Sequence, residues 1–364
     1  MHHLGIPTSR AATLIVTDDP IPRDMFYDGR LKNERGAVVL RVAPTWFRFG
    51  SFEILAKNHE FTELKKLADF ILENSFKHIQ EKGEDGYIAM FSEVCEKTAA
   101  MIAGWSTVGF AHGVMNTDNM SIVSVTIDYG PFGFIDEYNP SFTPNHSDDM
   151  GRYDLENQVN IGLWNLDKLA TALKHLLSAD KHPQLEIILQ GYGKHFQETQ
   201  LTLYRKKLGL LTKEDEDESL INLLLDIMQR TQADYTQTFR DISEISLDDL
   251  ENIRVPDSAW GLKTCLKSKQ TNEFISAYAD RVKRDGLEDE IRLQNMQDAN
   301  PRYILRNWVA QAAIEKAEQD DFSEVQFLLK LLQNPFRINL EAEKKGYASP
   351  PPSWSKKLAV SCSS

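Results

Sequence analysis

A long stretch without helical or strand periodicity, residues 108–153, constrains this chain more than any other feature of its sequence. It is dense in Gly, Asn, Asp and aromatic residues, and one short β-branched run within it, residues 122–127, predicts a strand. Long polar loop regions inside a folded domain are uncommon and are usually functional. We therefore expect the chain to fold around this segment and to carry its chemistry there.

Helical patterns flank the loop region on both sides. Residues 61–79 and 88–105 are helical by period, and the apolar residues of the second helix, Cys95 among them, form one stripe. Helical patterns also dominate residues 163–332. One apolar stripe lies near the start of this part, and two helical segments near its end form a pair around an acidic break. The stripe consists of Leu163, Leu166, Leu169 and Leu173, and the paired segments are residues 303–314 and 322–332.

The front of the chain is the only other part with β character. Residues 12–17 and 36–42 are rich in β-branched residues, and the turn-prone residues 18–33 separate them. They predict two strands with a long connection. Residues 1–4 are typical of the last turn of a helix, which Gly5 and a following proline would end. The fold class expected is therefore α+β and predominantly helical.

Charge and cysteine content exclude several function classes. The net charge of −13 over 364 residues argues against a nucleic-acid partner, which requires a basic surface. No apolar run is long enough to cross a bilayer, so we expect no membrane partner. The three cysteines, Cys95, Cys265 and Cys362, lie far apart without a CxxC pair, which argues against a disulfide framework or a zinc site.

The loop region contains the best candidates for catalysis. Asp118 and Asn119 can supply a base and an oxygen ligand from one loop, and Asp128 follows the predicted strand. Oxygen donors of this kind suit Mg²⁺ that bridges nucleotide phosphates, and kinases use a loop Asp, a loop Asn and a second Asp in this way. The same residue types are also typical of plain turns.

Longer motifs extend through the chain. They are residues 108–121 (VGFAHGVMNTDNMS), 127–134 (IDYGPFGF), 145–148 (NHSD), 151–153 (GRY), 164–166 (WNL), 305–308 (LRNW) and 361–364 (SCSS). These motifs resemble those of the SelO family over essentially the whole chain, and members of that family are pseudokinases that transfer AMP.

This resemblance implies a protein-kinase-like fold that moves AMP from ATP to Ser, Thr or Tyr hydroxyls of protein substrates, with Mg²⁺ or Mn²⁺. By motif position, Asp118 is the proton acceptor, while Asn119 and Asp128 hold the metal and Asp128 thereby binds the nucleotide. The implied domains are an N-lobe remnant (residues 1–55), a helical C-lobe (residues 56–345) and an extended tail (residues 346–364). Transfer of UMP instead of AMP is the alternative that the resemblance leaves open.

Two arginines and a histidine have more than one interpretation. Arg41 and Arg48 match family positions that line the triphosphate pocket, where a planar guanidinium can pair two phosphate oxygens. An exposed Arg is otherwise usually only a solvated charge. His112 either orients the catalytic loop or is a hydrogen-bonded core residue, and we favour a structural role over a catalytic one.

The tail carries the redox candidate. The family often has selenocysteine or cysteine where this chain has Cys362, in a proline-rich segment that we expect to be extended, mobile and solvated. Some relatives place a partner cysteine where this sequence has Pro144. We therefore expect no disulfide between the tail and the centre of the chain. We expect Cys95 to be buried, and the sequence does not decide whether Cys265 is buried or exposed.

An expected part of the nucleotide site has no match in the sequence. Residues 5–50 contain no glycine-rich loop followed by a strand Lys, which a kinase-like site requires. We expect an incomplete N-lobe, caused by an internal methionine taken as the start or by a truncated gene, and impaired transfer by this chain. The alternative is a catalytically silent binding module. The compartment would be the cytoplasm for a bacterial source and the mitochondrion for a eukaryotic one.

Overall fold

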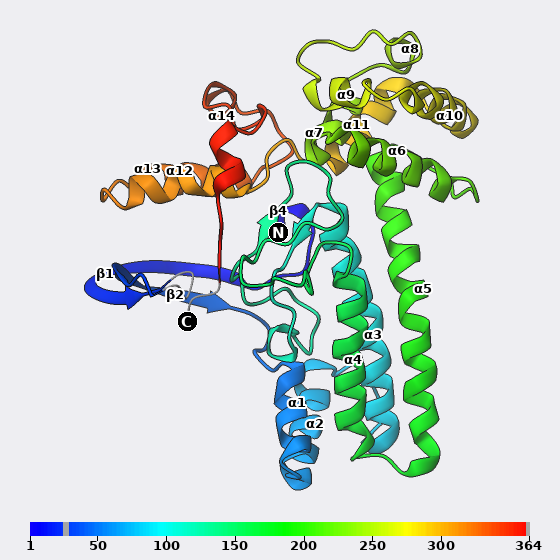
Figure 1. Ribbon diagram of the computed structural model, residues 1–364. Helices are drawn as coiled ribbons and strands as arrows, with labels where there is room; N and C mark the ends of the chain where they lie inside the picture. The colour runs from blue at the N-terminus through cyan, green and yellow to red at the C-terminus, as the bar shows by residue number, and fades with distance from the viewer. Residues whose placement is uncertain (25–28, 362–364) are drawn as a thin grey trace.

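The computed structural model of the protein describes residues 1–24 and 29–361 and has an α+β architecture (Figure 1). Helices make up most of the described chain, and two small antiparallel sheets accompany them. The helices are α1 (Phe49–Lys57), α2 (Phe61–Ser75), α3 (Gly83–Thr107), α4 (Gln158–Lys174), α5 (His182–Lys207), α6 (Asp217–Thr231), α7 (Tyr235–Ile242), α8 (Leu247–Glu251), α9 (Trp260–Cys265), α10 (Gln270–Asp285), α11 (Asp289–Ala299), α12 (Asn307–Ala317), α13 (Ser323–Leu332) and α14 (Leu340–Lys344). Among the described helices, none has the length and apolarity that a bilayer crossing demands.

The two predicted front strands form an exposed hairpin that projects from the helical body (Figure 1). The strands β1 (Arg10–Arg23) and β2 (Lys32–Val42) are antiparallel and longer than the sequence predicted. Much of the turn-prone connection is strand, because pairing continues from Pro20 opposite Arg35 to Arg23 opposite Lys32. An irregularity between Val16 and Pro20 accommodates the proline, which cannot donate a ladder hydrogen bond. Before the hairpin, the predicted helix end is a short 3₁₀ turn (His2–Leu4), and Gly5 follows it in the left-handed conformation.

The first helical layer consists of α1–α5, in which α3 and α5 lie side by side and α4 packs against α1 and α3 (Figure 1). The predicted stripe of α3 is confirmed, with Cys95 and Trp105 fully inside the core. In α4, Leu166, Leu169 and Leu173 are buried but Leu163 is exposed, contrary to prediction. At 100° per residue, Leu163 lies about 120° around the helix from Leu169, which takes it off the buried face.

The loop region contains only short strands, β3 (Phe110–Ala111) and β4 (Gly133–Phe134), which pair with each other. The predicted strand at residues 122–127 is wrong. Ser124 has a positive φ of 52° that interrupts extended backbone, and its hydroxyl lies 3.0 Å from that of Thr98. Ile122, Thr126 and Ile127 are buried, and Trp105 of α3 donates from Nε1 to the Thr126 hydroxyl at 2.9 Å.

The C-terminal helices α6–α14 build two further cores, as the helical periodicity of residues 163–332 predicted. The paired segments correspond to α12 and α13, which pack together around the acidic break. The segment after β4 joins the loop region to this part, since the Tyr235 N–H donates to the Asp136 carbonyl and the Tyr138 N–H donates to the Ala233 carbonyl, both at 2.9 Å.

The described part of the tail contacts the body at several points, whereas residues 349–360 are exposed or half-buried, in agreement with the expected solvation. Trp260 donates from Nε1 to the Ala348 carbonyl at 3.1 Å, and Tyr347 packs in the core around Trp308. Further along, the His146 N–H donates to the Val360 carbonyl at 2.9 Å. The prolines do keep the segment free of α-helix, as predicted. Donors on the body thus bind backbone carbonyls of the tail and hold the tail at these two points.

Candidate active site

The loop that carries Asp118 is a 3₁₀ turn, η2 (Thr117–Asn119), packed against α1. Helices from both sides hold it in place. The Thr117 hydroxyl donates to the Glu53 carboxylate of α1 at 2.5 Å, and the Asn165 amide of α4 donates to the Met115 carbonyl at 2.8 Å. The turn is therefore fixed by side chains whose own backbones are helical.

Asp118 is exposed and its carboxylate lies against the first turn of α1. A Cβ atom built on Gly50 would lie 2.1 Å from Asp118 Oδ1, so the carboxylate occupies the space that a side chain at residue 50 would fill. A depression of about 430 Å³ opens here, with Glu53 and Lys57 of α1 on its walls. An exposed carboxylate in a depression has the access that a general base requires.

The two proposed metal ligands have constrained geometry. The Asn119 side chain is nearly buried, and its Nδ2 donates to the Val114 carbonyl at 2.9 Å, which turns Oδ1 to the opposite side. Asp128 is half-buried and adopts a positive φ of 58°, which is uncommon for a residue other than glycine. The Gly130 N–H donates to its carbonyl at 2.9 Å and closes the tight turn.

His112 connects the two loops. Its Nε2 lies 2.8 Å from the Ile127 carbonyl, directly before Asp128, so this nitrogen carries the proton and donates. The Val114 N–H, at the start of the other loop, approaches Nδ1 at 3.5 Å. Burial lowers the pKa of the His112 ring, which is therefore neutral near pH 7. This geometry agrees with the structural role that we favoured, because the fully buried ring cannot reach a substrate.

Gly113 allows the loops to approach each other closely. Its φ is 85°, and a Cβ atom there would lie 2.3 Å from the Pro131 carbonyl oxygen. The Asn145 amide donates to the Gly113 carbonyl at 3.4 Å, which connects the NHSD motif to the same junction. The motifs around residues 112, 128 and 145 thus converge on one place in the fold.

The two arginines differ in their relation to this site. Arg48 is the N-cap residue of α1 and pairs antiparallel with Ser121, so it adjoins the Asp118 loop. Arg41 lies on the exposed hairpin with its guanidinium over the Trp46 ring at 4.9 Å. The structure therefore brings Arg48 but not Arg41 into direct backbone contact with the loop.

The oxygen donors fit a metal that the substrate helps to coordinate. Nowhere in the described chain do three or more His, Cys, Asp or Glu residues form a cluster able to hold a metal. Asn119 and Asp128 offer two oxygen donors of the kind that Mg²⁺ prefers. Mg²⁺ commonly binds through one or two carboxylates with water and phosphates as its other ligands, so a small donor set is consistent with it.

The described cysteines are unreactive by position. Cys95 and Cys265 are buried and free, and burial raises the pKa of both thiols, that of Cys265 to about 11. Burial of Cys95 is confirmed, and Cys265 is now assigned to the same class. Pro144 packs beside Gly113 and Gly133, and Cys362 lies outside the described residues.

Several supporting residues were not predicted from the sequence. Gln158 of α4 accepts from the His112 N–H at 2.9 Å and donates to the Phe110 carbonyl at 3.0 Å. Glu53 and Asn165 hold the Asp118 turn, as described above. Asn165 lies in the WNL motif, which was the only available signal, while nothing marks Gln158 or Glu53.

Comparison with known protein families gives one match that covers most of the chain. The family described as protein adenylyltransferase SelO matches residues 1–333 of the 364 residues. The matched range includes every motif around the Asp118 and Asp128 loops.

Proposed function

Because the chain belongs to the SelO family of protein adenylyltransferases, we propose that it transfers AMP from ATP to Ser, Thr or Tyr hydroxyls of proteins at the Asp118 site. The observation that carries this proposal is the buried His112 ring, which holds the base-bearing loop and the Asp128 turn in one arrangement. A fixed spacing of base and metal ligands is what a phosphoryl-type transfer demands of a protein.

In the proposed reaction, Asp118 accepts the proton of the acceptor hydroxyl. The hydroxyl oxygen bonds to the α-phosphorus, the bond from that phosphorus to the bridging oxygen breaks, and pyrophosphate leaves. Asn119 and Asp128 would hold Mg²⁺ or Mn²⁺, which supplies charge neutralisation at the phosphates. Arg48, beside the loop, is proposed to pair phosphate oxygens, and Arg41 is proposed to do the same from the end of the hairpin.

The domain division that we propose follows the expected one. Residues 1–55 would belong to an N-lobe, residues 56–345 to a kinase-like C-lobe, and residues 346–364 to a tail, with Cys362 as its redox-active residue. We propose that this chain alone transfers AMP weakly, because a phosphate-covering glycine loop with its Lys is not found in residues 5–50. A silent binding module and a UMP donor are the rival proposals.

A two-label assay tests the function. The protein is incubated with Mg²⁺, a mixed protein acceptor and ATP labelled at either the α- or the γ-phosphate. Label from α-ATP should enter protein and label from γ-ATP should not. Incorporation of γ-label alone would mean kinase activity. Much greater incorporation of label from UTP than from ATP would favour uridylylation, and no incorporation would favour the silent module.

Gly50→Ala should lower the transfer rate by about ten- to a hundredfold with little loss of stability. The new methyl group would displace the Asp118 carboxylate, and a shift of about 1 Å in a reacting group can cost about a hundredfold. Steady-state kinetics and thermal melting are compared with those of Gly191→Ala, on α5, where the added Cβ meets only ordinary contacts. Equal rates in the two variants would show that Asp118 does not act from this position.

A further inference from the structure

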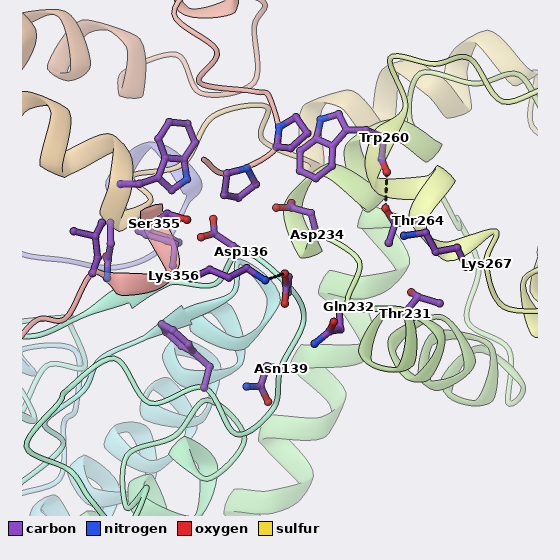
Figure 2. Close-up of a pocket in the computed structure, with 18 residues that line it drawn as sticks. Asp136, Asn139, Thr231, Gln232, Asp234, Trp260, Thr264, Lys267, Ser355 and Lys356 are labelled. Carbon is purple, nitrogen blue, oxygen red and sulfur yellow. Dashed lines mark hydrogen bonds and ion pairs between the residues drawn. The ribbon is translucent and has the colours of Figure 1, made fainter. Parts of the chain in front are cut away.

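Charge distinguishes two of the cavities that lie apart from the Asp118 depression. One, of about 670 Å³, lies between the segment after β4, helix α9 and the tail (Figure 2). The carboxylates and the cations around it balance one another. They are Asp136, Glu137 and Asp234, and Arg306, Lys356 and Lys267. No net charge therefore selects a ligand in this cavity.

The other cavity, of about 600 Å³, lies between the C-terminal ends of α3, α5 and α11 and the N-terminal segment. Its volume is within the usual range for sites that bind small molecules. Much of its wall is apolar and comes from Leu4, Ile6, Met101, Val108, Leu203 and Phe336. Such a wall favours a ligand with an apolar body, because binding removes apolar surface from water.

Lys207, the last residue of α5, brings an amine without a counter-charge to this cavity. The residue is only 5% exposed. Its Nζ lies over the Phe239 ring, 4.5 Å from the centroid, and forms no hydrogen bond or ion pair with any described residue. Burial lowers the pKa of this amine to about 7, since no carboxylate offsets the loss of water around it.

The Lys207 amine is open to the cavity and is not sealed in the core. Trp308 Nε1 is an example of a buried polar atom that has neither solvent contact nor a hydrogen-bond partner, but Lys207 Nζ is not such an atom. Because Nζ also lacks a partner, it keeps contact with solvent, and the cavity that Lys207 lines supplies this contact. A ligand in the cavity can therefore reach the amine.

The charges on the wall favour an anionic ligand. The Asp298 carboxylate is neutralised by Arg337 at 3.1 Å, and Lys97 pairs with a glutamate one turn before it on α3. Lys206 is exposed on the wall and, like Lys207, forms no ion pair with any described residue. Two positive charges therefore remain without a counter-charge.

We propose that this cavity binds an amphipathic carboxylate, such as a medium-chain fatty acid. The apolar chain lies against α3 and the N-terminal segment, and the carboxylate accepts a hydrogen bond from Lys207 Nζ with Lys206 nearby. Hydrogen bonds between ionised partners are among the strong ones, and here the amine has no competing acceptor in the described chain. The proposal does not depend on the Asp118 site or on its activity.

Octanoate and 1-octanol test the proposal, because they share a chain and differ in charge. Each is titrated into the intact 364-residue chain by isothermal titration calorimetry. Octanoate should bind saturably with a dissociation constant below about 1 mM, since burial of its methylene groups is favourable. Lys207→Met should weaken octanoate binding about ten- to a hundredfold and leave 1-octanol within about threefold, because only octanoate loses a charge-assisted hydrogen bond.

Three further variants locate the site. Lys206→Met should weaken octanoate binding about two- to fivefold, whereas Lys194→Met, an exposed lysine of α5 that does not line the cavity, should have no effect. Ala100→Trp, at an exposed wall position, should weaken both ligands at least about threefold by filling part of the cavity, and it tests the site even if Lys207→Met does not fold. Thermal melting of each variant shows whether it folds.

Any of three results would overturn the proposal. The first is no saturable octanoate binding up to about 5 mM. The second is an equal effect of Lys207→Met on the two ligands, which would remove the pairing of amine and carboxylate. The third is an equal loss of octanoate binding in Lys194→Met and Lys207→Met, or no effect of Ala100→Trp, either of which would place the ligand elsewhere on the protein.

Discussion

Asp118→Asn should lower the rate of AMP transfer by about a hundred- to ten-thousand-fold, the usual contribution of a general base. The substitution keeps the size of the side chain beside Gly50 and removes only its basicity. The dissociation constant for Mg²⁺–ATP should stay within about threefold, because the base acts on the barrier and not on the ground-state complex. Single-turnover labelling gives the rate and calorimetry gives the affinity.

Asp128→Asn is the matched comparison, since it replaces one carboxylate oxygen by an amide nitrogen in the other loop, as Asp118→Asn does in the first. We expect it to weaken metal-dependent ATP binding at least about tenfold. Removing a residue that supports a metal ligand already lowers metal affinity by this much, and removing a ligand itself should lower it at least as far. ATP binding measured without metal should be unchanged. If both variants lost binding equally, the division of roles between Asp118 and Asp128 would be wrong.

The parts of the fold that could be predicted are those in which one periodicity governs many residues. The α3 stripe through Cys95 and Trp105 is an example, because a core face recurs every three or four positions. Residues 122–127 were misassigned since β-branched residues fill a buried loop as well as a strand, and the positive φ of Ser124 depends on α3. The contact of the tail with the body was not predicted because the hydrogen bond from Trp260 to Ala348 joins residues that are distant in sequence.

The candidate site likewise has a part that the sequence predicts and a part that it does not. Asp118, Asn119 and Asp128 lie in contiguous motifs, so their identity was accessible, although their roles stay proposals. The close approach of Gly50 to Asp118 joins residues on different elements, and no pattern within either segment encodes it. Sequence reasoning thus identified the candidate site residues and missed the residues that hold them in place.

Arg306, in the LRNW motif, illustrates a motif residue whose contacts are structural. Its side chain is 2% exposed and forms two hydrogen bonds to Asp234, which is 3% exposed, and an ion pair to Asp136. Asp234 also caps α7, where its carboxylate accepts from the Gln237 N–H at 2.8 Å. One buried cation therefore holds the loop after β4 against the start of α7.

Arg306→Met should lower the free energy of unfolding by about 3–5 kcal/mol, because it leaves the Asp234 charge buried without its partner. Urea denaturation at pH 7 measures this loss. Arg254→Met, which removes the exposed ion pairs to Asp248 and Asp249, should have a much smaller effect because solvent screens them. Adding Asp234→Asn to Arg306→Met should recover part of the loss, since Asn keeps the cap without the charge.

The loss in Arg306→Met should also shrink as the pH falls. Burial raises the pKa of Asp234 and Arg306 opposes this rise, so removing Arg306 raises the pKa further above its unfolded value. The folded variant then binds a proton more tightly than the unfolded chain, and protonation stabilises it. The deficit relative to the unmodified protein is therefore largest near pH 7 and smaller near pH 5. A deficit independent of pH would show that Met disturbs packing and that the Asp234 charge is not the cause.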